Sequence, residues 1–335
     1  MKTEIKVGCI GCGGRGKLYS SSINKISDFK MWAYADKFGE KAQAFLNEYG
    51  GNYATSDVER VLTDPDIDVV FICTHHDTHH PFVVKAAQNE KHILVEKPMA
   101  MTIEECQDIE KEVNEAGVTL ACGFKMRFMP MVKMAREVIG NPLMIVGQMM
   151  DNRWGDTSWA QQPKMGGGNV ISQGCHTADL LCYFAGADPV KVHAAGGTMT
   201  HENTDIIDNV VATVEFENGT VASMIQGDAG HNPFASKFFF ELFSKDGRGV
   251  CLYNRCHDAH YWGVKELGHI TAETYSEETK IDPEGDFLLL KHFCESVLEG
   301  KQTIVGPREG RIATTLILKI FDSIRSGKTQ HMALS

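Results

Sequence analysis

The chain has 335 residues, and 33 basic against 44 acidic side chains give a formal net charge of -11. Hydrophobic residues make up 43% and charged residues 23%, as in globular proteins, and the length suffices for two cores. The acidic balance argues against nucleic-acid binding, and no apolar stretch approaches the roughly 20 residues of a membrane helix. No leader pattern precedes the first strand pattern, and the cysteines lie mostly in apolar runs. We therefore expect a cytoplasmic protein that binds neither nucleic acid nor a membrane.

The first 123 residues alternate short apolar strands with amphipathic helices. Strand patterns lie at Ile5–Ile10 and at residues 31–35, 69–73 and 93–95. Helix patterns extend to about residue 26 and from residue 40 to residue 49. Continuous apolar strands separated by helices are typical of a parallel sheet covered on both faces. The sequence therefore predicts a doubly wound α/β domain over residues 1–123.

Residues 124–335 show a different pattern. Apolar and polar residues alternate at 210–216, and apolar strands at 238–243 and 250–253 flank Asp246-Gly247. Asn218-Gly219 ends the first of these strands, and such turn residues suit positive φ, so the pattern predicts antiparallel hairpins. A late helix with an apolar face between Ala313 and Ile324 is expected to end at Gly327. We expect an α+β domain with a large, mostly antiparallel open sheet.

A glycine-rich turn, Gly11-Cys12-Gly13-Gly14-Arg15-Gly16, follows the first strand and opens the first helix. It fits G-x-G-x-x-G, in which glycines let a pyrophosphate approach the N–H groups at the helix start. Asp36 ends the second strand, where a carboxylate accepts hydrogen bonds from the adenosine ribose and repels a 2′-phosphate. Lys37 follows and leaves NADP possible. The sequence predicts a Rossmann domain that binds a nicotinamide dinucleotide, with NAD preferred.

Three further motifs carry polar side chains. Glu96-Lys97-Pro98 follows a parallel strand, and a lysine at such a carboxyl end can stabilise a developing alkoxide. The run from Thr74 to His79 follows another strand, and a segment from Gly166 to Asp179 contains a Gly-Gly-Gly run and a His-x-x-Asp pair. Alone, Lys97 would be read as a surface lysine and His176 as a structural histidine.

In this order and spacing, the motifs resemble the Gfo/Idh/MocA family, named for glucose-fructose oxidoreductase, inositol dehydrogenase and a rhizopine-catabolism protein. The resemblance spans nearly the whole chain. It implies a second domain whose open sheet forms a homo-oligomer, a dimer or tetramer, and hydride transfer between the nicotinamide and a secondary hydroxyl of a sugar or cyclitol. It also implies that Lys97 holds the reacting hydroxyl and that His176 is the general acid/base, a role that suits imidazole.

One position departs from the family pattern. Many inositol-dehydrogenase-like members carry Asp four residues before the catalytic histidine, where this chain has Ser172. A hydroxyl orients a ring or substrate but does not stabilise an imidazolium as a carboxylate does. The difference counts against inositol dehydrogenase specifically. Asp179, one turn after His176, either supports that ring or is a structural carboxylate.

The candidate site residues form three sets. The catalytic set is Lys97, His176 and Ser172. The cofactor set is Gly11, Cys12, Gly13, Gly14, Arg15, Gly16, Asp36, Lys37, Thr74, His75, His76, His79, Glu96 and Lys97. The substrate set, which combines polar donors with a flat apolar ring as sugars require, is Arg127, Arg153, Trp154, Asn209 and Asp179.

Other interpretations remain open at this stage. The histidines between 75 and 80, and the set Cys251, Cys256, His257 and His260, contain metal-ligating residue types, but neither has the spacing of a structural zinc site. We therefore expect no metal. Two alternative functions are a catalytically inactive protein that senses a sugar or dinucleotide, and an enzyme that uses NAD to assist glycoside cleavage.

Overall fold

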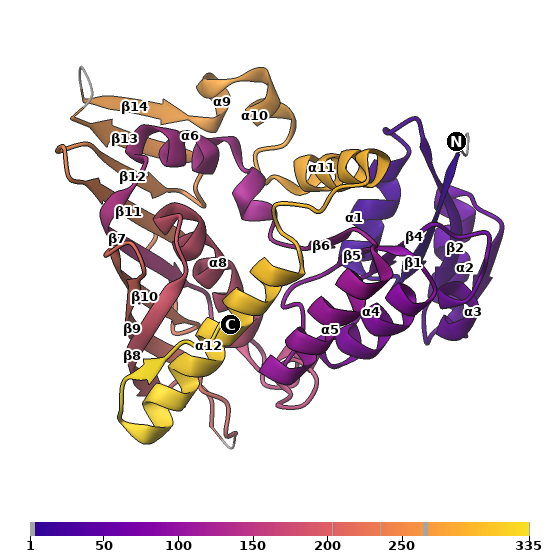
Figure 1. The fold of residues 1–335 in the computed structure, drawn as a ribbon, viewed down its shortest axis with the longest axis horizontal. Coiled ribbons are helices and arrows are strands. Elements are labelled where there is room, and N and C mark those ends of the chain that lie inside the picture. Colours follow the sequence, from indigo (N-terminus) through magenta and orange to yellow (C-terminus); the bar gives the residue numbers. More distant parts are fainter. Residues whose placement is uncertain (1–3, 203, 235, 264–266, 335) are drawn as a thin grey trace. The chain divides into compact units, whose positions relative to one another are not determined.

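The protein is described by a computed structural model over residues 4–202, 204–234, 236–263 and 267–334 (Figure 1). It contains two compact units: residues up to 124 with 287–311, and residues 125–286 with 312–335. The expected division at 123/124 therefore lies one residue from the first change of unit, but it assigned 287–311 to the other domain. The reason is hydrogen bonding to the backbone of β6 (Leu120–Cys122), the last strand of the first unit. The Cys122 N–H donates to the Val305 carbonyl at 2.8 Å, and the Thr303 hydroxyl donates to the Leu120 carbonyl at 2.7 Å.

The first unit is a parallel sheet with strand order β3-β2-β1-β4-β5-β6. This order confirms the predicted Rossmann sheet. Its strands are β1 (Ile5–Ile10), β2 (Phe29–Ala35), β3 (Tyr53–Thr55), β4 (Val69–Ile72), β5 (His92–Val95) and β6 (Leu120–Cys122). All four residues of β4 have no exposed surface, as a central strand covered on both faces requires.

Helices and turns connect these strands. They are α1 (Gly14–Ile23), α2 (Gly39–Tyr49), α3 (Val58–Leu62), η1 (His76–Thr78), α4 (His79–Gln88) and α5 (Ile103–Ala116), and α11 (Asp286–Glu299) returns to this unit. The first helix ends three residues before the expected end near Ile26. There the N–H groups of Lys25 and Ile26 donate to carbonyls three residues back, which tightens the chain into a turn.

The second unit is built on a sheet with strand order β14-β13-β12-β11-β7-β10-β9-β8-β15 in the described part of the chain. Only β7 and β10 pair in parallel there, so the predicted mostly antiparallel sheet is confirmed. The strands are β7 (Pro142–Met150), β8 (Pro189–Gly197), β9 (Asn209–Phe216), β10 (Val221–Gly227), β11 (Phe238–Ser244), β12 (Gly249–Tyr253), β13 (Asp258–Trp262), β14 (Gly268–Thr271) and β15 (Gln330–His331). Both expected hairpins form, with Gly219 at φ 85° and Gly247 at φ 84°.

Helices pack on one face of this sheet (Figure 1). They are α6 (Pro130–Ile139), α8 (Gly174–Ala185) and the C-terminal part of α12 (Pro307–Ser326). The unit also contains η2 (Lys125–Phe128), η3 (Trp159–Gln161), α7 (Asn169–Ser172), α9 (Ala272–Tyr275) and α10 (Glu277–Ile281). Helix α12 is the expected late helix: Leu316, Ile317 and Ile320 are completely buried, and Gly327 follows its end at φ 65°. The opposite face of the sheet carries exposed apolar side chains on β7, β9 and β10.

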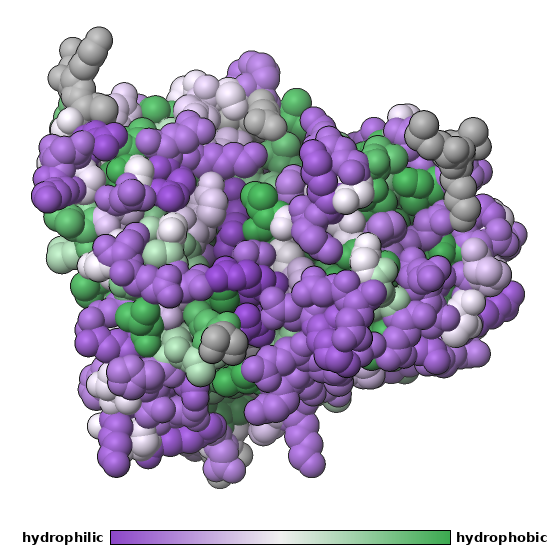
Figure 2. Space-filling view, viewed as in Figure 1, coloured by the Kyte–Doolittle hydropathy of each residue, from purple (hydrophilic) through white to green (hydrophobic). Residues whose placement is uncertain are grey.

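Among the helices of the described residues, none combines the length and the apolar character needed to cross a bilayer. In the space-filling view, hydrophobic residues are scattered in small groups between hydrophilic ones (Figure 2).

Candidate active site

The glycine-rich turn has the shape of a phosphate-binding loop. Gly11 has φ 94°, and a Cβ there would lie 2.5 Å from the Cys73 carbonyl oxygen. A Cβ at Gly16 would lie 2.2 Å from the Gly11 carbonyl oxygen, so only glycine lets α1 pack this closely. At Gly13 and Gly14, by contrast, an added Cβ would meet no described atom within 4 Å beyond the adjoining backbone. The N–H groups at the start of α1 are therefore open to a pyrophosphate, and the turn fits a dinucleotide.

The Asp36 carboxylate lies beside this turn at the carboxyl end of β2. Its Oδ2 accepts the backbone N–H of Cys12 at 2.8 Å, and its Oδ1 accepts that of Phe38 at 2.9 Å. These bonds fix the carboxylate and leave lone pairs for ribose hydroxyls. Lys37 is exposed, with its Nζ 5.2 Å from the centre of the Phe38 ring. The position of Asp36 is the one expected of a ribose acceptor, while the choice between NAD and NADP stays a prediction.

Glu96 is a buried carboxylate next to Lys97. Its Oε1 accepts hydrogen bonds from Arg15 Nε at 2.5 Å and from the Tyr19 hydroxyl at 2.7 Å. Burial alone would raise the pKa of Glu96, but the Arg15 and Lys97 cations outweigh it and lower that pKa. The ionised carboxylate ties α1 to the end of β5, where Lys97 is half-buried. Arg15, expected at the cofactor, is thus held by Glu96 and Tyr19, and its contact with a dinucleotide stays a prediction.

The histidines after β4 have separate environments. His79 is completely buried, with Nδ1 2.8 Å from the Pro98 carbonyl oxygen and Nε2 3.3 Å from that of Thr74. Burial lowers the pKa of His79, so the ring is neutral near pH 7, and its single N–H belongs to the shorter contact. His79 therefore fastens the turn that follows Lys97. Burial and the nearby Lys37 cation lower the pKa of His75, which is only half-buried.

Ser172 and His176 lie on neighbouring turns of the second unit. Ser172 ends α7 and is 4% exposed, and His176 lies in the first turn of α8 and is 5% exposed. The glycine run before α7 is required by close packing. A Cβ at Gly168, which has φ 90°, would lie 2.3 Å from Ile206, and one at Gly166 would collide with the Ala160 backbone. The run therefore sets where α7 and the start of α8 lie.

Two of the expected substrate residues, Arg127 and Asp179, bind each other. Arg127 donates from Nε to both oxygens of Asp179, at 3.0 and 2.9 Å, and from Nη2 to Oδ1 at 2.7 Å. Asp179 is 1% exposed, and the Arg127 guanidinium lies 5.3 Å from the centre of the Tyr183 ring. This buried, bidentate pair favours the structural interpretation of Asp179, and direct substrate contact by either residue stays a prediction.

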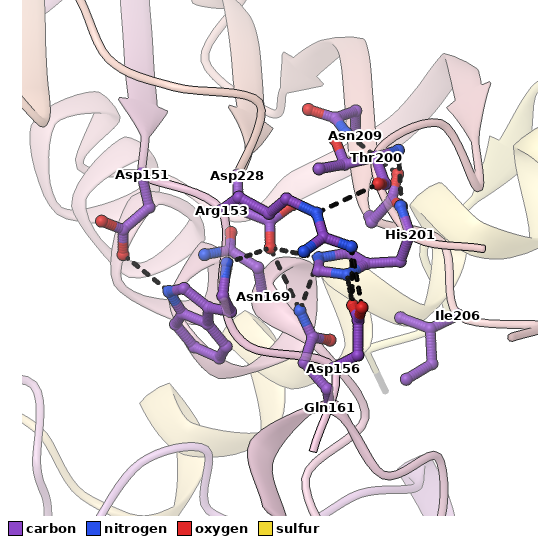
Figure 3. Close-up of polar contacts among 12 residues, drawn as sticks. Asp151, Arg153, Asp156, Gln161, Asn169, Thr200, His201, Ile206, Asn209 and Asp228 are labelled. Carbon is purple, nitrogen blue, oxygen red and sulfur yellow. Dashed lines mark hydrogen bonds and ion pairs between the residues drawn. The ribbon is translucent and has the colours of Figure 1, made fainter. Parts of the chain in front are cut away.

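The other three substrate candidates, Arg153, Trp154 and Asn209, belong to one polar network, in which Figure 3 labels Arg153 and Asn209. Trp154 donates its backbone N–H to Asp228 at 3.3 Å and its indole N–H to Asp151 at 3.1 Å. Arg153 is exposed, pairs with Asp156 at 2.8 Å and donates to the Thr200 carbonyl at 3.4 Å. The same Thr200 accepts, at its hydroxyl, the Asn209 amide at 2.6 Å.

The centre of this network was missed by sequence reasoning. Gln161 and His201 point toward Asp228, which is completely buried (Figure 3). These residues are 27 to 67 positions apart in the chain, so no local spacing signals them. The one sequence signal was Asp228 itself, a carboxylate directly after an alternating strand.

Among the described residues, no three or more His, Cys, Asp or Glu side chains are grouped so that they could hold a metal ion. Cys251 and His260 are cross-strand neighbours on β12 and β13, but His260 stacks on Tyr253 and His269.

Comparisons with known proteins agree with the fold of both units. A family model described as an oxidoreductase family with an NAD-binding Rossmann fold matches residues 5–124, and the model of the GFO/IDH/MocA C-terminal domain matches residues 133–246. The uncharacterized oxidoreductase YrbE of Bacillus subtilis (strain 168) is 30% identical over 230 residues, which are 66% of this chain and 67% of that protein.

Two further similarities extend over nearly the full length. The scyllo-inositol 2-dehydrogenase (NAD(+)) of Bacillus subtilis (strain 168) is 26% identical over 345 residues, 98% of this chain and 96% of that protein. The structure of a levoglucosan dehydrogenase in complex with NADH and levoglucosan has a TM-score of 0.87 at 21% identity, over 99% of this chain and 100% of that one. With both units matched, the chain belongs to the Gfo/Idh/MocA family of oxidoreductases and carries an NAD-binding Rossmann domain.

Proposed function

We propose that this oxidoreductase transfers a hydride between NAD and a secondary hydroxyl of a sugar or cyclitol. One observation carries the proposal: this chain, a member of the family, has both Lys97 and His176. Lys97 lies on a turn fixed by the buried Glu96, and His176 is buried in the first turn of α8. The relatives include a scyllo-inositol 2-dehydrogenase, which supports this substrate class.

In the proposed mechanism, each chemical task has its own side chain. A nicotinamide dinucleotide held by the Gly11–Gly16 turn and Asp36 would supply the acceptor for the hydride of the carbinol carbon. Lys97 donates a hydrogen bond to the hydroxyl oxygen and stabilises the negative charge that develops there. His176 takes the hydroxyl proton, the carbonyl forms, and in the reverse direction His176 returns that proton. Ser172 orients the imidazole or the substrate by hydrogen bonding and adds no charge.

The preference for NAD over NADP is part of the proposal. Asp36 is held by the Cys12 and Phe38 N–H groups, so its carboxylate cannot swing away from a 2′-phosphate without losing both bonds. The exposed Lys37 offers a partial counter-charge on a flexible stem. NADP binding is therefore expected, but it should be weaker than NAD binding.

A substrate panel tests the activity. Monosaccharides, anhydrosugars and inositols are mixed with the full chain and NAD, and the absorbance of the reduced cofactor is followed. His176→Ala should reduce turnover by about 10²–10⁴-fold while NAD affinity, measured by calorimetry, changes little. His193→Gln, an exposed histidine on β8, is the matched control and should leave turnover unchanged. No turnover with any polyol, despite tight NAD binding, would refute the proposal.

Ser172 favours a second candidate, because the family resemblance implies a carboxylate at this position and the chain has a hydroxyl. A protein that senses a sugar or dinucleotide would need no acid/base, so its cellular function would survive His176→Ala unchanged. The same panel separates a third outcome, NAD-assisted cleavage of a glycoside. That activity would release a sugar leaving group with no net change in reduced cofactor.

We also propose that the chain forms a homo-oligomer through the uncovered face of the second unit's sheet. Met144, Val211 and Val221 on this face are 52%, 55% and 42% exposed, and Val221 and Met144 are cross-strand partners. Apolar side chains on an open face favour burial against a second copy. Val211→Glu should lower the mass measured by light scattering, whereas Leu298→Glu, on α11, should not. A monomeric unmodified chain would refute this proposal.

We also propose that the protein is located in the cytoplasm. Buried thiols such as Cys9, Cys106 and Cys294 pack as small apolar side chains in the core, as in proteins of reducing compartments.

A further inference from the structure

The loop between β7 and η3, residues 151–158, contains Trp154 and is called the Trp154 loop; it is held by one buried carboxylate. Asp228 follows β10 and has no exposed surface. Its Oδ2 accepts the Trp154 backbone N–H at 3.3 Å and the Gln161 side-chain N–H at 3.1 Å, and His201 Nε2 lies 2.7 Å away. The other oxygen, Oδ1, has no hydrogen-bond partner among the described residues. Asp228 therefore depends on the groups at Oδ2 to offset the cost of its burial.

His201 lies between two carboxylates. Its side chain is 3% exposed, with Nδ1 2.6 Å from Asp156 Oδ1 and Nε2 2.7 Å from Asp228 Oδ2. A carboxylate only accepts hydrogen bonds, so each contact requires an N–H on the ring. A neutral imidazole has one N–H, and an imidazolium has two. Both contacts are therefore satisfied together only when His201 is positively charged.

The surrounding groups favour that charged form. Burial opposes the charge, but the bonds to Asp228 and Asp156 outweigh it and raise the pKa of His201. Arg153, paired with Asp156, opposes the charge more weakly, and Asp208 accepts the His201 backbone N–H at 2.9 Å. The Gln161 amide nitrogen lies 2.8 Å from Nε2, and because Nε2 already donates, the Gln161 N–H belongs to Asp228.

The imidazolium closes a ring of contacts around Trp154. Asp156 is on the same loop as Trp154, and Asp228 holds both the Trp154 backbone and the Gln161 side chain. The indole N–H is held at its other end by Asp151, which also pairs with Lys237. We propose that His201, as an imidazolium bridging Asp156 and Asp228, is a positioning residue that keeps the Trp154 loop arranged to bind polyol, and that loss of its proton releases the loop. The substrate part of this inference rests on the proposed function.

The direction of release follows from burial. When His201 is deprotonated, the remaining N–H stays on Nε2, because Asp228 is completely buried and has no alternative cation at Oδ2 among the described groups. Nδ1 then presents a lone pair to Asp156, whose side chain is 57% exposed and turns to solvent. Rising pH therefore frees the loop at Asp156. The bond that is lost, from His201 to Asp156, is charge-assisted and holds the loop that is proposed to bind substrate. Its loss should raise KM for the polyol about tenfold and change kcat little.

The loop itself can be observed without catalysis. The full chain has 4 tryptophans and is labelled with 5-fluorotryptophan; Trp154→Phe assigns the Trp154 fluorine resonance. Without cofactor or substrate, that resonance should shift in a single step whose midpoint lies above the ordinary histidine value of about 6.5. His201→Gln should fix it at the high-pH position. Asp156→Asn changes an exposed side chain outside the core and should lower the midpoint. The control His193→Gln, also at an exposed residue, should leave the midpoint unchanged.

Kinetics then connect the loop to substrate. KM for the polyol should rise with the same midpoint as the fluorine shift, and His201→Gln should show a raised, pH-independent KM. A Trp154 resonance that does not titrate, or one that still titrates in His201→Gln, would overturn the inference. A KM for the polyol that stays constant across the pH range of the fluorine shift would also overturn it. If no polyol is turned over, the proposed function fails, and the fluorine titration alone decides whether His201 holds the loop.

Discussion

Replacing Asp179 with Asn separates a structural role from a substrate role for the Arg127–Asp179 pair. Arg127 donates to both carboxylate oxygens at 2.7–3.0 Å, and the two side chains are 11% and 1% exposed. Asn keeps one oxygen, removes the charge and turns an NH₂ group toward the guanidinium. The buried Arg127 guanidinium then loses the carboxylate that it contacts at both oxygens.

The magnitude follows from this geometry. Removing one partner of a buried, hydrogen-bonded ion pair costs about 3–5 kcal/mol of folding free energy. At about 1.4 kcal/mol for each factor of ten, the unfolding equilibrium of the second unit should shift by about a hundredfold to a few thousandfold. Replacing both partners, as Arg127→Met with Asp179→Leu, should recover much of the loss, because no buried charge is then left alone.

Urea unfolding followed by circular dichroism measures the effect. The midpoint of the unfolding transition should fall in Asp179→Asn and partly recover in the double variant. Asp322→Asn is the matched control, because Asp322 is 45% exposed and its pairing with Lys319 should contribute little. An Asp179→Asn protein that unfolds like the unmodified chain but loses kcat or substrate affinity would refute the structural role.

Two further predictions concern carboxylates of known surroundings. Asp36→Ser should raise NADP affinity about tenfold to a hundredfold, because it removes a like charge beside the 2′-phosphate. Lys37→Ala should lower NADP affinity with little effect on NAD. Calorimetry with both cofactors measures these affinities, and an unmodified chain that binds NADP as tightly as NAD would contradict the prediction. His257 at 3.2 Å and nearby lysine and arginine cations hold the pKa of Glu284 well below its ordinary value. Its stabilisation is therefore complete above the unfolded value of about 4.3 and is lost as pH falls below it. Glu284→Gln should weaken the acid-induced loss of stability seen by thermal unfolding, whereas Glu277→Gln, at an 83% exposed side chain, should not.

Local patterns were enough to predict the parts of the fold that local physics determines. The continuous apolar run of β4 predicted a buried parallel strand, and Asn218-Gly219 predicted a hairpin, because each signal lies within a few residues. The return of residues 287–311 to the first unit could not be predicted in this way. It depends on bonds such as Thr303 to Leu120, between residues 183 positions apart. Similarly, no local pattern predicted the bond between Arg127 and Asp179, because these residues are 52 positions apart.

The candidate site residues show the same division, with a consequence for pH dependence. Glycines, Lys97 and His176 lie in short motifs, but the groups that hold the surrounding structure are buried carboxylates, each paired with a cation. Glu96 pairs with Arg15, Asp179 pairs with Arg127, and Asp228 pairs with His201. Arginine stays charged throughout the physiological range, whereas histidine does not. The turn that carries Lys97 and the start of the chain's α8 helix should therefore keep their arrangement as pH rises. The Trp154 loop alone among these three should change, so we expect pH to alter the proposed polyol affinity through this loop and not through the Lys97 turn or the start of α8.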